Sequence, residues 1–69
     1  MDKDTLNINI RKFLKKLGIK SQREMEEAVA KAVNSGDLKG DERLVATAQI
    51  ALEGTDVNFV ITEEIALTK

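Results

Sequence analysis

The chain contains no histidine, cysteine, tyrosine or tryptophan among its 69 residues. Without cysteine it can form no disulfide, and without histidine or cysteine it lacks the usual ligands of a structural zinc ion. The same absences remove the side chain that acts as a general base near neutral pH and the thiolate nucleophile. We therefore expect no catalytic residues, no cofactor and no metal site, and we predict that the protein is not an enzyme.

Proline is also absent, and the only aromatic residues are Phe13 and Phe59, which offer little surface for stacking on single-stranded nucleic acid. No apolar run approaches the roughly 20 residues that a membrane-spanning helix needs. The N-terminus, MDKDTLNINI, lacks the basic leader and long apolar core of a secretory signal. These observations predict a cytoplasmic protein without a membrane partner.

The composition is that of a folded protein, with 42% hydrophobic and 33% charged residues. Its length predicts a single small α+β domain over residues 1–69. A chain this short buries only about 60% of the surface that it exposes when unfolded, so a monomer has marginal stability. Because disulfides and zinc are excluded, self-association as a homodimer is the remaining means of stabilisation.

Charge is distributed unevenly along the chain, although the net charge is only −1. Residues 1–20 carry six basic and two acidic groups, whereas residues 37–69 carry three basic and seven acidic groups. A basic cluster can contact phosphate or an acidic partner, and the candidate residues here are Arg11, Lys12, Lys15, Lys16, Lys20 and Arg23. We favour the alternative that they form the solvated face of an amphipathic helix, partly balanced by the acidic C-terminal third.

The first part of the chain has the periodicity of an amphipathic helix. Apolar residues recur at helical intervals from Leu6 to Leu17, and Asp4 or Thr5 is suited to cap the N-terminus. An apolar alternation at the start also fits a strand, but the helical pattern is longer and accounts for more residues. We expect this helix to end at Gly18.

A second helix is predicted from Ser21 to Gly36. Ser21 and Glu24 have the spacing of a capping box, in which each side chain accepts a hydrogen bond from the backbone N–H of the other residue. Gly36 is suited to the left-handed position that follows a helix. The apolar face comprises Met25, Ala28, Val29, Ala32 and Val33. The short link between the two helices predicts a helix–turn–helix or a helical hairpin.

The apolar period then changes from 3.6 to 2, which predicts two strands joined by a loop at residues 53–56. If Leu52 faces Val57, apolar side chains meet on one face of the hairpin, with Ile50 opposite Phe59. The same register places Glu63 opposite an alanine on that face. We expect either a bulge near Thr62 that turns Glu63 outward or a strand that has already left the core there.

The predicted fold is therefore α+β, with two N-terminal helices joined by a short turn and followed by a C-terminal antiparallel β-hairpin. A two-stranded sheet has two unpaired edges and is barely stable alone. Pairing the same edge of two copies across a two-fold axis would give a four-stranded sheet in a dimer.

Three sequence patterns resemble those of a family of small uncharacterised bacterial proteins, a domain of unknown function. The patterns are NxxIRKFLKK at residues 7–16, GxxSQRE at residues 18–24 and SGxLKG at residues 35–40, followed by a hairpin. The resemblance spans nearly the whole chain. It implies a shared fold and carries no established activity.

The order of helix, turn, serine-capped helix and hairpin is also similar to the core of a winged helix, with Ser21–Ser35 as recognition helix. Acidic residues on that helix and at the wing tip would be repelled by phosphates. We therefore predict a non-catalytic protein-interaction module that acts as a homodimer and binds an unknown protein partner. The alternative is a winged-helix-like nucleic-acid-binding protein that uses the basic first helix and turn.

Overall fold

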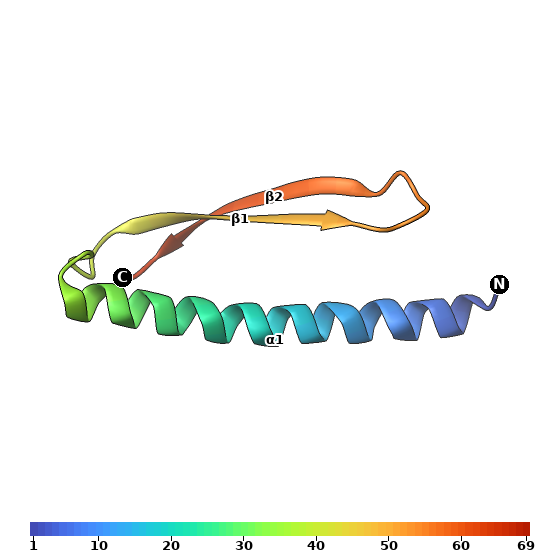
Figure 1. Cartoon of the computed structure of the whole chain (residues 1–69), viewed down its shortest axis with the longest axis horizontal. Helices are drawn as coiled ribbons and strands as arrows, with labels where there is room; N and C mark the ends of the chain where they lie inside the picture. Colours follow the sequence, from blue (N-terminus) through green and yellow to red (C-terminus); the bar gives the residue numbers. More distant parts are fainter. The chain divides into compact units, whose positions relative to one another are not determined.

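The computed structural model describes residues 1–69 and contains one helix and one hairpin (Figure 1). The elements are helix α1 (Lys3–Ser35), strand β1 (Arg43–Ala51) and strand β2 (Asn58–Ala66). The chain divides into two compact units, Met1–Asp37 and Leu38–Lys69. The first unit holds the helix and the second holds the hairpin.

The prediction of two N-terminal helices is wrong, because α1 runs without a break through Gly18 and Ser21. Gly18 does not have the positive φ of a helix-ending glycine. A glycine inside a helix costs only about 1 kcal/mol relative to alanine, which a long helix can tolerate. The apolar stripe continues in phase across the expected turn, because helical intervals separate Leu14, Leu17, Ser21 and Met25.

Both ends of α1 are capped. At the N-terminus the carboxylate of Asp2 accepts hydrogen bonds from the backbone N–H of Asp4 at 2.9 Å and of Thr5 at 3.2 Å. The expected cap at Asp4 or Thr5 is therefore wrong by two or three residues, since both residues lie inside the helix. At the C-terminus Gly36 has a φ of 85° and donates its N–H to the carbonyl of Val33 at 3.1 Å, as predicted.

The hairpin has the predicted register. Ile50 pairs with Phe59, and the backbone N–H of Leu52 donates to the carbonyl of Val57 at 3.1 Å. The loop between them turns at Gly54, which has a φ of 79°. A positive φ at the third residue of a turn strongly favours glycine.

The expected bulge near Thr62 is absent, because the strands pair without interruption to Arg43 and Ala66. Glu63 therefore stays opposite Ala46 on the apolar face. Every residue of β2 is exposed, so the Glu63 carboxylate remains hydrated and nothing forces the backbone to turn it outward.

No side chain of the chain is buried. A lone helix and a two-stranded sheet are each one layer thick, whereas a hydrophobic core needs two layers packed together. The best-covered residues of α1 are only half-buried; they are Leu17, Ser21, Val29, Ala32 and Val33. Large apolar side chains remain exposed in both units, among them Phe13 at 56% and Ile61 at 52%.

Candidate functional site

All six basic candidate residues lie on α1, and we call them the basic face; they are Arg11, Lys12, Lys15, Lys16, Lys20 and Arg23. At 3.6 residues per turn they occupy about half of the helix circumference. No acidic residue interrupts the segment from Arg11 to Arg23. The continuous helix therefore brings together residues that the sequence had assigned to a helix, a turn and a second helix.

Two shallow hollows run along the basic face. One is centred on Ile19 and is lined by five of the basic residues, and the other is lined by Ile8, Arg11, Lys12 and Lys15. Ile8 and Ile19 are about half exposed among these cations. Lysine and arginine side chains at this density can contact the phosphates of a polyanion. One of these basic side chains also forms an ion pair, since Lys20 Nζ lies 3.6 Å from Glu24 Oε1.

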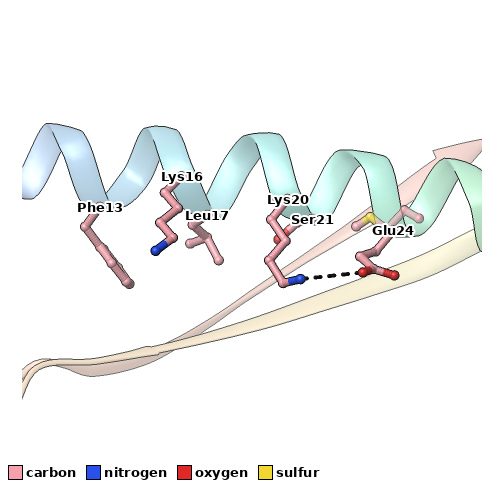
Figure 2. Close-up of a pocket in the computed structure, with 7 residues that line it drawn as sticks. Phe13, Lys16, Leu17, Lys20, Ser21 and Glu24 are labelled. Atoms are coloured by element: carbon pink, nitrogen blue, oxygen red, sulfur yellow. Dashed lines mark ion pairs between the residues drawn. The ribbon is translucent and has the colours of Figure 1, made fainter.

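The other side of α1 carries an apolar stripe, whose members are Leu6, Ile10, Phe13, Leu14, Leu17, Met25, Ala28, Val29, Ala32 and Val33, with Ser21 near its middle. A groove lies along it, lined by Phe13, Leu17, Ser21 and Met25 and bordered by Lys16, Lys20 and Glu24. Figure 2 shows Phe13, Leu17 and the bordering charged residues extending from the same side of the helix. The groove exists only because the helix does not stop at Gly18.

Sequence reasoning missed this groove because it divided the stripe into two separate helical faces. The signal was present in the sequence. The step from Leu17 to Ser21 to Met25 keeps the helical interval across the supposed turn. Ser21 is half-buried on the apolar stripe in the middle of α1, whereas the capping-box prediction placed it at the N-terminus of a second helix.

The two faces of the hairpin differ. One face gathers apolar side chains, namely Leu44, Ala46, Ala48, Ile50, Phe59, Ile61 and Ile65, with Glu63 among them. The other face is held by polar pairs. Arg43 Nη1 lies 2.8 Å from Glu64 Oε1, and Gln49 Nε2 donates to Asn58 Oδ1 at 3.0 Å.

Two carboxylates accept backbone hydrogen bonds at element boundaries. Hydrogen bonds to its carboxylate lower the pKa of Asp2. The largest effect comes from the backbone N–H of Thr5, followed by the Thr5 hydroxyl and the N–H of Asp4. The pKa of Glu42 is lowered by the N–H groups of Lys39, at 2.8 Å, and Gly40, at 2.9 Å. These groups fix local backbone geometry and are solvated, so neither is poised for acid–base chemistry.

The structure contains no group of three or more acidic, His or Cys side chains that could hold a metal ion. The length and hydropathy needed to cross a membrane are found in no helix of the structure.

A family model with the description "Family of unknown function (DUF6494)" matches residues 1–68. No curated protein and no solved structure matches the chain. The predicted membership of a family without an assigned activity is confirmed by this match, which covers almost the whole chain. The chain belongs to the Family of unknown function (DUF6494).

Proposed function

We propose that the protein is a non-catalytic interaction module that works as a homodimer. The observation that carries this proposal is that no side chain is buried, although apolar side chains line one face of each unit. Exposed apolar patches of this extent on a soluble protein mark interaction surfaces. The non-catalytic part is supported by the lack of histidine and cysteine, which are the usual general base and thiolate nucleophile near neutral pH.

Sedimentation equilibrium of the wild type and two variants tests the proposal. Each variant replaces one apolar side chain, and the two replaced residues lie on opposite sides of α1. We expect the wild type to have twice the 7.6 kDa chain mass. Leu17→Gln removes a half-buried residue of the apolar stripe and should weaken the dimer at least tenfold, because a buried Leu contributes about 2 kcal/mol. Ile19→Gln changes the basic face and should leave the mass unchanged. A single-chain mass for the wild type at high protein concentration would overturn the proposal.

A second candidate function is the binding of a phosphate-bearing polyanion by the basic face. It is favoured by the uninterrupted run of cations from Arg11 to Arg23. The winged-helix arrangement is not part of this candidate, because the turn that would separate a recognition helix is absent.

An amide NMR titration with duplex DNA at low and then moderate salt tests this second candidate. Shifts confined to the basic face that weaken steeply with salt would support it, since release of counterions drives such binding. A double variant with Lys12→Gln and Lys15→Gln should abolish these chemical-shift changes. Lys39→Gln, a change outside α1, should leave them as in the wild type. An absence of shifts at low salt would exclude nucleic acid.

A further inference from the structure

We infer that the homodimer forms by antiparallel pairing of the apolar stripes of two α1 helices, about a two-fold axis near Ile19. The inference rests on the proposed function and specifies its partner surface as a second copy of the same helix. Three features of α1 carry it: the spacing of its apolar residues, the sizes of their side chains and the order of its charges.

The apolar stripe has a period of 11 residues. Leu6, Leu17 and Ala28 are separated by this interval, as are Ile10, Ser21 and Ala32, and also Leu14 and Met25. Eleven residues make slightly more than three full turns, so such a stripe stays nearly parallel to the axis of a straight helix. The stripe therefore offers one continuous seam along α1.

The length of this seam favours another helix as its occupant. Thirty-three residues of helix extend about 50 Å, whereas each strand, with nine residues, extends only about 30 Å. A hairpin of this length cannot cover the whole seam, and a second α1 can.

Side-chain size changes along the seam and sets the direction of pairing. The N-terminal half presents Leu6, Ile10, Leu14 and Leu17, and the C-terminal half presents Ser21, Met25, Ala28 and Ala32. Antiparallel pairing about residue 19 sets Leu6 against Ala32 of the partner subunit, and Ile10 against Ala28 of the partner subunit. Large residues then meet small ones in these two layers and where Leu17 meets Ser21, whereas Phe13 and Leu14 lie against Met25 of the partner subunit. Parallel pairing would set large against large and small against small along the whole seam.

The groove on α1 fits this arrangement. Its floor is Ser21, a small residue between the larger Leu17 and Met25. The same antiparallel register brings Leu17 of the partner subunit over Ser21, where it fills the groove as a knob fills a hole. Parallel pairing would place two serines against each other and leave the groove empty.

Charge order favours the same direction. Residues 11–20 of α1 carry five cations and no anion, and residues 24–27 carry three anions and no cation. In the antiparallel pair residues 24–27 of one helix lie level with residues 11–14 of the other, so Arg11 and Lys12 meet an acidic segment. Residues 15–20 lie level with residues 18–23 of the partner subunit, which are also basic. In a parallel pair like charges would lie side by side over the whole length, which is destabilising.

Distance measurements between spin labels test the direction. The chain has no cysteine, so single cysteines can be introduced at Asn9 and Asn34, which are exposed and lie off the apolar stripe. For antiparallel pairing, two Asn9→Cys labels should be about 30 Å apart along the axis, at 1.5 Å per residue. In a mixed dimer, a label at position 9 and one at position 34 should be within about 10 Å along the axis.

Parallel pairing predicts the reverse, with a short distance between the two labels at position 9 and about 37 Å along the axis for the mixed pair. A dimeric mass with these reversed distances, or with distances that fit neither arrangement, would overturn antiparallel pairing and leave the proposed homodimer intact. A single-chain mass in the same samples would overturn both. A dimeric mass with the antiparallel pattern in both labelled samples would support the inference.

Discussion

Carboxylates with backbone partners hold the boundaries of the structural elements. Asp2 accepts two backbone N–H groups and the hydroxyl of Thr5 at the start of α1. Glu42 accepts two backbone N–H groups just before β1. Each satisfies donors that would otherwise have only water as partner. The sequence predicted a cap at Asp4 or Thr5, but which carboxylate caps depended on where the first turn begins.

We expect the first turn of α1 to fray in acid because Asp2 becomes protonated. Its folded-state pKa lies below the ordinary value of 3.8, so its stabilising contribution is complete above that value and is lost as the pH falls through the lower folded-state pKa. The ¹³Cα chemical shifts of residues 3–6, followed from neutral to strongly acidic pH, measure the loss. Asp2→Asn keeps the acceptor oxygen but removes the Asp2 carboxylate, so its first turn should be less sensitive to pH than that of the wild type. Equal fraying in both proteins would contradict this role.

At the scale of elements, local sequence signals predicted the hairpin correctly but not the number of helices. A period of 2 admits one register, because a slip by one residue moves every apolar side chain to the opposite face. The pairing of Ile50 with Phe59 follows directly. Gly18 and Ser21 have the residue types of a helix end and a helix start, yet both also fit inside a helix. Local signals were therefore ambiguous, and only the phase of the stripe across them distinguished the two outcomes.

Alanine substitutions at two glycines of the first unit test the continuity of α1. A Cβ at Gly18 meets nothing within 4 Å and the residue is helical, so Gly18→Ala should stabilise the helix by about 0.5–1 kcal/mol. Gly36 has a φ of 85°, so Gly36→Ala should destabilise it by about 1 kcal/mol. Thermal unfolding followed by circular dichroism at one fixed protein concentration compares the two. Destabilisation by Gly18→Ala would favour a helix that ends there.

Glu63 is expected to limit the aggregation of the hairpin. It lies on the apolar face between Ile61 and Ile65, in a sheet with two free edges. A charge at such a position opposes the stacking of apolar strands from many copies. Glu63→Val should therefore form fibrils faster than the wild type, as measured by thioflavin fluorescence. Glu64→Val removes the same charge from the other face and is the matched control. Equal rates for the two variants would contradict the assignment.

At the scale of the whole molecule, the sequence predicted that association is needed but did not identify the surface. The prediction followed from length and from the missing disulfide and zinc ligands. The proposed surface depends on a continuous stripe along the 33-residue helix α1, which two shorter helices would not have formed. The expected four-stranded sheet placed the contact on the hairpin edge, whereas the antiparallel pairing that we propose places it on α1.

Folding and association should therefore occur together. Dilution should lower the midpoint of thermal unfolding and the helix content in parallel, because in the proposed dimer the apolar surface becomes buried on association. Circular dichroism at a series of protein concentrations measures both quantities, and Ile19→Gln should follow the wild-type curve while Leu17→Gln lies below it. An unfolding midpoint that is independent of concentration would show that one chain folds alone.

The absence of a buried side chain also has a consequence for the lifetime of the protein in the cell. If the chain is ordered only as the proposed dimer, its folded fraction rises with its own abundance, and proteases act on the unfolded remainder. Newly made copies below the dissociation constant of that dimer would then be degraded, whereas copies above it would persist. Slow synthesis would thus leave almost no intact protein, and a modest rise in expression would produce a disproportionate rise in its steady-state level.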